Sequence, residues 1–167
     1  MIETERLTLR LPRPDDAESL VEAISDPEVM RYIGDGSTGG LAAAEHAIAR
    51  WLERWEESGI GQFVAERRED GRYVGRVGFL VWDPERWEPG PEGETEIGWT
   101  IVRSQWGYGY ATEAALALRD WTDRPRLISL IQHGNDRSVR VAEKIDERYE
   151  RDVVVRGVAT RMYALQR

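Results

Sequence analysis

Cysteine is absent from this sequence of 167 residues. Its absence excludes disulfide bonds, thiolate metal sites and any mechanism that holds an acyl group on an enzyme cysteine. Histidine is scarce as well, since only His46 and His133 occur, and neither belongs to a metal-binding spacing such as His-Glu-x-x-His. We therefore expect no metal site, and we expect any group transfer to be direct or to use another nucleophile.

Long apolar runs and an excess of basic residues are also missing. No run approaches the ~18 apolar residues of a membrane span, and the first five residues lack the apolar core of a signal peptide. The 23 Lys and Arg are outnumbered by 31 Asp and Glu, and the net charge of −8 argues against a nucleic-acid partner. We expect a cytoplasmic protein without a membrane partner. Its acidic surface either attracts a cationic substrate or only confers solubility.

The order of the predicted elements indicates one domain of mixed α/β character. Apolar residues make up 41 per cent of the chain, and neither a repeat nor a linker divides residues 1–167. Periodicity predicts helices over 14–25, 41–57, 109–121 and 135–145, and strands over 5–10, 62–67, 73–82, 94–102, 126–132 and, as one strand or more, 153–165. An Asp70-Gly71 turn predicts a hairpin between the second and third strands. The domain is therefore of the α+β type.

A glycine motif, Trp106-Gly107-Tyr108-Gly109-Tyr110-Ala111-Thr112, lies where a strand gives way to a helix. Two glycines one residue apart allow a sharp turn that leaves amide groups uncovered, and the helix directs its positive end at the same point. A dinucleotide fold would need glycine at Thr112, and a Walker A loop would need Gly-Lys-Ser/Thr, which does not occur. The motif therefore predicts a site for another cofactor that carries a pyrophosphate.

Four stretches together resemble the GNAT acyltransferase superfamily, in the branch that includes the RimJ and RimL N-terminal acetyltransferases. They are the glycine motif, the opening Thr4 to Arg10, the Glu96-Ile97-Gly98-Trp99 segment, and the helix from Asn135 to Ile145. The resemblance implies the GNAT fold, a central mixed and mostly antiparallel twisted sheet of about six to seven strands flanked by about four helices. It also implies transfer of an acetyl group from acetyl-CoA to a primary amine.

The resemblance assigns a set of cofactor-binding residues. The pyrophosphate of acetyl-CoA is expected on the backbone amides of the glycine motif, and the pantetheine arm beside a splayed strand end and the following helix. The residues implied are Thr100, Ile101, Val102, Trp106, Gly107, Tyr108, Gly109, Tyr110, Ala111, Thr112, Asn135 and Ser138. Trp106 departs from the superfamily pattern, which has Arg or Gln there, but matches the RimL-like branch.

Two residues are the candidates for catalysis. Many superfamily members reprotonate the CoA thiolate with a tyrosine at the position of Ala142, whereas the RimL-like branch uses a serine that matches Ser138. Glu96 is the first candidate for the base that deprotonates the amine, although it is equally interpreted as a structural strand residue. Glu113 is a weaker candidate, because its place in the first turns of a helix explains it without chemistry.

Several alternatives stay open from the sequence. The acceptor is a protein N-terminus, such as that of a ribosomal protein, or a small cationic amine, in a pocket expected to involve the first two helices and residues 83–93. Asp146 replaces the glycine that usually ends the helix of the second motif, and the tyrosine is missing, so a catalytically degenerate acyl-CoA-binding or sensor module is the alternative. The Gly34 to Gly40 stretch is either a lid or a connector. A homodimer is possible.

Overall fold

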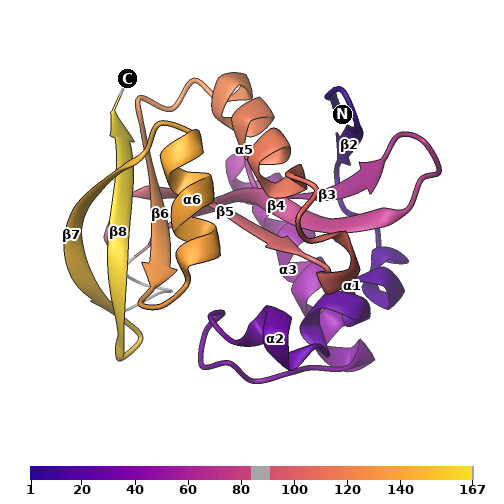
Figure 1. Cartoon of the computed structure of the whole chain (residues 1–167). Coiled ribbons are helices and arrows are strands. Elements are labelled where there is room, and N and C mark those ends of the chain that lie inside the picture. Colours follow the sequence, from indigo (N-terminus) through magenta and orange to yellow (C-terminus); the bar gives the residue numbers. More distant parts are fainter. Residues whose placement is uncertain (84–90, 167) are drawn as a thin grey trace.

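One twisted sheet of eight strands, in the order β1-β2-β3-β4-β5-β6-β8-β7, forms the centre of the protein (Figure 1). A computed structural model describes residues 1–83 and 91–166. The strands are β1 (Ile2–Glu3), β2 (Leu7–Arg10), β3 (Gln62–Arg67), β4 (Tyr73–Val81), β5 (Thr95–Ile101), β6 (Arg126–Gln132), β7 (Arg148–Val155) and β8 (Val158–Gln166). The helices are α1 (Asp16–Ile24), α2 (Pro27–Met30), α3 (Leu41–Ser58), α5 (Tyr110–Trp121) and α6 (Asp136–Lys144), with a 3-10 turn, η1 (Arg103–Gln105), before α5.

Helices cover both faces of the sheet because the strands alternate apolar side chains between the two. Phe63 of β3 and Ile97 of β5 are buried against Leu118 of α5 in one cluster. Val64, the next residue of β3, is buried with residues of α1 and α3 in a second cluster. In Figure 1, α5 and α6 lie in front of the sheet and α3 behind it. The expected α+β architecture is confirmed.

The centre of the sheet contains a break in its pairing. Every neighbouring pair of strands is antiparallel except β5 and β6, which run parallel and match only at Glu96 and Ile128. β4 stays paired with β5 as far as Ile101. The edge of β5 that faces β6 is therefore unpaired beyond Glu96, whereas the edge that faces β4 is paired throughout. Figure 1 shows the arrowheads of β5 and β6 diverging. The sheet therefore contains the splayed strand end that the sequence predicts.

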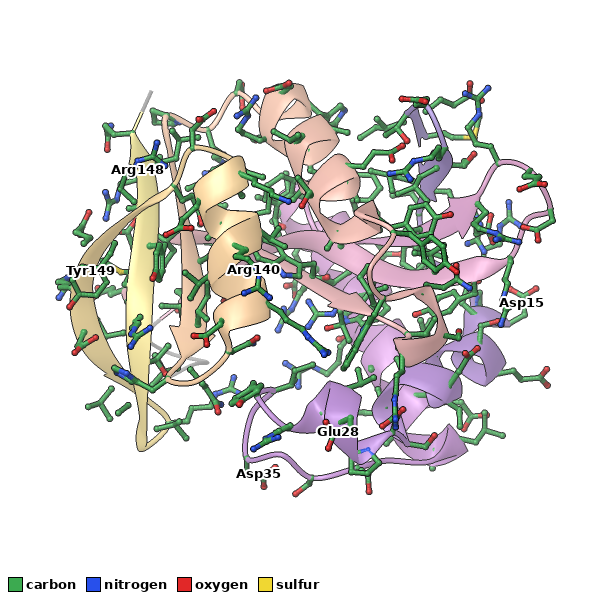
Figure 2. The ribbon with its side chains drawn as sticks, in the orientation of Figure 1. Asp15, Glu28, Asp35, Arg140, Arg148 and Tyr149 are labelled. Atoms are coloured by element: carbon green, nitrogen blue, oxygen red, sulfur yellow. The ribbon has the colours of Figure 1, made fainter. Side chains whose placement is uncertain are left out.

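The C-terminal region contains two strands after α6, which agrees with the expected one strand or more, but β7 begins at Arg148, earlier than the predicted start at residue 153. β7 and β8 are joined by Arg156 and Gly157, whose φ angles of 51° and 81° are those of a type I′ turn. The first five residues of β7 are exposed, as Figure 2 shows for Arg148 and Tyr149, since β7 is the outer strand. An edge strand of this kind lacks the apolar alternation from which strands are predicted.

A short helix that the sequence did not predict follows α1. The helix expected over 14–25 ends at Ile24, and then Asp26 accepts a hydrogen bond from Glu28 N at 2.8 Å and Pro27 begins α2. The glycine-rich stretch that follows is bonded at both ends: Gln132 Nε2 donates to Gly34 O at 2.8 Å, and Gly39 N to Ile24 O at 2.8 Å. The first bond ties the segment to the end of β6 and the second ties it to the end of α1. Residues 84–90 of the predicted acceptor segment lie outside the described residues.

Asp146 adopts the left-handed conformation expected of the glycine that it replaces, with φ of 69°. Its carboxylate accepts a hydrogen bond from Arg119 Nη1 at 2.5 Å, and the same nitrogen donates to Ile145 O at 3.4 Å. Arg119 therefore connects α5 to the end of α6. Aspartate adopts this conformation at less cost than most residues, though at more cost than glycine.

We predict that Asp146→Gly raises the free energy of unfolding by about 0.5 to 1 kcal/mol, because the backbone strain removed exceeds the value of a largely exposed ion pair. Chemical denaturation measures the change. Asp146→Ala is the control and should be destabilised, since it keeps the strain and loses the ion pair. A glycine variant less stable than the alanine variant would contradict the prediction.

Candidate active site

The glycine motif forms a turn that exposes backbone amides at the start of α5. Gly107 and Gly109 both have left-handed φ angles, 86° and 83°, and a β-carbon at Gly107 would meet no atom within 4 Å. The α-helical ladder starts with Glu113 N donating to Gly109 O at 3.0 Å, so the amides of Tyr110, Ala111 and Thr112 have no acceptor within the helix. Open space beside a helix N-terminus suits the phosphates of a cofactor.

Trp106 anchors this turn to the end of β5. Its indole Nε1 donates to Ile101 O at 2.7 Å, which uses the indole donor within the protein. The guanidinium of Arg137, in the first turn of α6, lies 4.3 Å from the centre of the Trp106 ring. Arg137, which the sequence reasoning did not name, thus brings the first turn of α6 next to the phosphate turn.

A second anchor comes from the N-terminus. Glu113 Oε1 accepts hydrogen bonds from Thr4 Oγ1 at 2.6 Å and from Arg6 N at 2.8 Å, and Arg6 Nε donates to Oε2 at 2.7 Å. Arg6 Nη1 also donates to Tyr108 O at 2.9 Å, in the phosphate turn itself. Burial raises the pKa of Glu113, but these hydrogen bonds outweigh it and hold the pKa below its usual value. Both carboxylate oxygens of Glu113 therefore have hydrogen-bond partners in the N-terminal segment.

The open edge of β5 lies between this turn and α6. The hydroxyl of Ser129 donates to Ile97 O at 2.9 Å and the Trp106 indole to Ile101 O, so residues 97, 99 and 101 present their backbone groups to the β6 side. The backbone of Thr100 faces β4 instead, opposite Arg76. Trp99 thus joins the residues expected along the pantetheine arm, and it packs against the buried cluster that contains Ala142 of α6.

The first turn of α6 carries the predicted acid. Asn135 is the N-cap, and its Oδ1 accepts a hydrogen bond from Ser138 N at 3.3 Å. Ser138 is partly exposed, and its hydroxyl donates to no group in the described part of the chain. The side chain of Asn135 therefore caps the helix, and the hydroxyl of Ser138 is not used for capping.

Glu96 lies at the point where β5 and β6 part, as the only residue of β5 in register with β6. Its Oε2 accepts a hydrogen bond from Trp82 Nε1 at 2.9 Å. Burial raises the pKa of Glu96 to about 7, against the opposing influence of the Trp82 hydrogen bond and the charge of Arg76. A carboxyl group with a pKa near neutrality is suited to act as a general base.

A second buried carboxyl group, which the sequence reasoning did not identify, lies on the other side of the opening. Glu147 follows Asp146, is fully buried, and neither of its oxygens has a hydrogen-bond partner in the described structure. Ser129 is a polar neighbour, but its hydroxyl donates to Ile97 O. Burial, with a smaller contribution from the charge of Glu96, raises the pKa of Glu147 to about 8, against the opposing influence of Ser129. Glu147 is therefore mostly protonated at neutral pH.

The remaining polar candidates are peripheral. Nε2 of His133 lies 3.5 Å from Asp152 Oδ1 on the exposed edge of the sheet, and His46 is exposed on α3. Within residues 1–83 and 91–166, no group of three or more His, Asp or Glu side chains is arranged to hold a metal ion. No helix in these residues is long and apolar enough to cross a membrane.

Comparison with known proteins identifies the family. The model of the acetyltransferase (GNAT) domain matches residues 6–147. The chain belongs to the GNAT family of acetyltransferases. A curated relative of this GNAT chain, the uncharacterized protein YkkB of Bacillus subtilis, is 33% identical over 158 residues, which cover 90% of this chain and 86% of the relative.

Solved structures agree with the GNAT assignment. The GNAT-family acetyltransferase from Bacillus anthracis has a TM-score of 0.80 and 26% identity, and the match covers 99% of this chain and 97% of that one. RimL, a ribosomal L7/L12 α-N-protein acetyltransferase solved with coenzyme A, has a TM-score of 0.79 over 98% of this chain and 95% of its own. RimL is 14% identical, so it shares the fold with this GNAT protein.

We predict that Arg6→Met weakens binding of acetyl-CoA several-fold and lowers the free energy of unfolding by about 1 to 3 kcal/mol, because it releases the phosphate turn from the N-terminus. Calorimetric titration with CoA and chemical denaturation measure the two effects. Arg68→Met is the matched control, since Arg68 binds Glu3 and Thr4 O but does not reach the turn. Equal CoA affinity in the two variants would show that Arg6 does not support the turn.

Proposed function

We propose that this GNAT acetyltransferase moves an acetyl group from acetyl-CoA directly to a primary amine while both substrates are bound. The observation that carries the proposal is the position of Glu96: its partly exposed carboxyl group lies at the point where β5 and β6 part and the open edge of β5 begins. We propose that the amine and the thioester react at this point. Cysteine is absent from the chain, which argues against an acyl-enzyme intermediate on a thiol.

The described residues suit acetyl-CoA as the donor. The glycine turn offers backbone amides and space for the pyrophosphate, and the outward-facing groups of Trp99 match the amides of a pantetheine arm as a neighbouring strand would. The first turn of α6, held over the glycine turn by Arg137 and Trp106, borders the same channel. The thioester would then lie near Glu96.

The reaction at this site is a single transfer. Glu96 takes a proton from the amine, and the nitrogen attacks the carbonyl carbon of the thioester. A carbon–nitrogen bond forms and the carbon–sulfur bond breaks. The hydroxyl of Ser138 gives its proton to the departing sulfur and recovers one from solvent. The products are an N-acetylated amine and CoA.

The test is the release of free CoA thiol from acetyl-CoA in the presence of a panel of amines, from N-terminal peptides to small cationic amines. The chain has no cysteine of its own, so every thiol detected comes from CoA. Turnover of an amine supports the proposal. Thermal stabilisation by acetyl-CoA with no turnover on any amine would favour instead a binding or sensor module, the alternative motivated by Ala142 and Asp146.

We predict that kcat/KM rises with pH through an inflection near 7, because Glu96 accepts a proton only when it is ionised, and its pKa is about 7. Trp82→Phe removes a hydrogen bond that favours the ionised form, so the inflection should move upward by up to about one pH unit. Glu96→Gln should lower the rate by a factor on the order of 10² to 10⁴. Trp121→Phe, on α5, is the control and should leave the inflection in place. A pH profile of kcat/KM that is unchanged in Trp82→Phe would contradict the assignment of Glu96 as the base.

Ser138→Ala is expected to lower kcat by a factor on the order of 10², with little change in KM for acetyl-CoA, because it removes a proton donor without altering the N-cap made by Asn135. Steady-state kinetics at saturating acetyl-CoA measure the effect. Ser138→Thr keeps a hydroxyl and should retain more activity. Full turnover by Ser138→Ala would end the assignment of this residue as the acid.

A further inference from the structure

An arginine in the centre of the sheet has no carboxylate partner among the described residues. Arg76 of β4 stands opposite Thr100 of β5, and its Nη1 donates to Gln62 Oε1 at 3.0 Å. Within residues 1–83 and 91–166, no carboxylate makes a salt bridge with its guanidinium. Desolvation lowers the pKa of Arg76, while the charge of Glu96 acts in the opposite sense. A desolvated guanidinium held only by an amide oxygen is an incompletely neutralised charge.

The side chains of Arg76 and Glu96 border the same space, next to Gly98. A β-carbon built on Gly98 would lie 3.6 Å from Arg76 Nη1 and 3.6 Å from Glu96 Oε1. Glu96 Oε2 is occupied by Trp82, so Oε1 is the oxygen that faces this space. Arg76, Gly98 and Glu96 are each partly exposed, although Gln62 and Thr100 beside them are buried. The missing side chain of Gly98 thus leaves a small opening flanked by one carboxylate and one guanidinium.

We propose that the acceptor is a small molecule with a carboxylate next to its primary amine, an α-amino acid in the simplest case, whose amine meets Glu96 and whose carboxylate binds Arg76. The inference rests on the proposed function, since it concerns the acceptor of the same reaction. Guanidinium and carboxylate form paired, charge-assisted hydrogen bonds. The two charges of such an acceptor would complement the two charges around Gly98.

The local charge around Glu96 differs from that of the whole protein. The net charge is −8, yet three arginines, Arg76, Arg156 and Arg54, each lower the pKa of Glu96. Arg156 also lies over the ring of Trp82, 5.8 Å from its centre. Arg76 would repel a cationic acceptor that has no anionic group, whereas an α-amino acid carries no net charge.

A free α-carboxylate also distinguishes small molecules from protein N-termini. The α-amine of a peptide is followed by an amide, which offers a guanidinium no negative charge. A polyamine or an amino sugar lacks the carboxylate altogether. The inference therefore favours a free amino acid over the two acceptor classes that the sequence left open.

The experiment compares each of the twenty L-amino acids with its amide, which keeps the side chain and the amine but removes the charge. Thiol release gives kcat/KM for both members of each pair. The amide's amine loses its proton more readily, so reactivity alone favours the amide. We expect at least one amino acid to exceed its amide by about 10- to 100-fold. Equal or better use of the amide throughout would overturn the inference while leaving the acetyltransferase activity established.

Two variants link the preference to this opening. Arg76→Met should abolish the preference, mainly through KM for the amino acid, and Arg76→Lys should restore part of it. Gly98→Ala places a methyl group between the two charges at ordinary contact distance, so it should fold and lower kcat/KM for the acid without changing affinity for CoA. Arg72→Met, on the exposed β3–β4 hairpin, is the matched control. A preference that persists in Arg76→Met would overturn the inference.

Calorimetric titration keeps the inference testable if no amine is acetylated, an outcome that would refute the proposed function alone. Protein saturated with CoA is titrated with the same amino acids and amides. Binding of an acid but not its amide, lost in Arg76→Met and retained in Arg72→Met, supports the carboxylate site. Absence of carboxylate-dependent binding together with absence of turnover would overturn both.

Discussion

The divergence of β5 from β6 is the constraint on which the rest of this structure depends. Two parallel strands that match at one position leave a row of backbone groups without a partner in the sheet, and unpaired backbone groups are costly when buried. The protein supports the open edge on all sides: the Ser129 hydroxyl and Trp106 indole each take one carbonyl oxygen, and α6 packs against Trp99. What remains open is the edge of β5 between Glu96 and the glycine turn.

Ionisable side chains lie near the point where β5 and β6 part, and burial there shifts their pKa values. Burial raises the pKa of both Glu96 and Glu147, and the charge of Glu96 contributes to the raised pKa of Glu147. Glu96 keeps one oxygen free beside the partly exposed Gly98, whereas Glu147 is fully buried. This difference in access is consistent with the proposed role of Glu96 as the base, whereas Glu147 is a mostly uncharged group of the interior. Arg76 completes this pattern, because its positive charge faces the same opening as Glu96 without an ion-pair partner in the described structure.

Local patterns identified most of the fold and much of the candidate site. The strand at 126–132 and the hairpin at Asp70-Gly71 agree with the structure because alternation and turn chemistry act within a few residues. The first residues of β7, 148–152, were not predicted because they are solvated on an edge strand. Arg6 and Arg137 were not assigned to the phosphate turn, since each reaches it through contacts between residues distant in the chain. No local sequence pattern marks Arg76 as a site residue, since it is one of many arginines in the chain and lies in an otherwise apolar strand.

The sequence by itself determined the family, the two glycines of the turn, the Asn135 cap and the residue types available for proton transfer. These features depend on backbone conformation and on side chains within one turn or strand, which neighbouring residues specify. Only the tertiary structure decided that β5 and β6 part at Glu96, that Glu113 is engaged by the N-terminus, and that Arg76 and Glu96 share the space at Gly98. Each is a matter of which distant groups meet and how much water they lose, and desolvation is set by the packed structure as a whole.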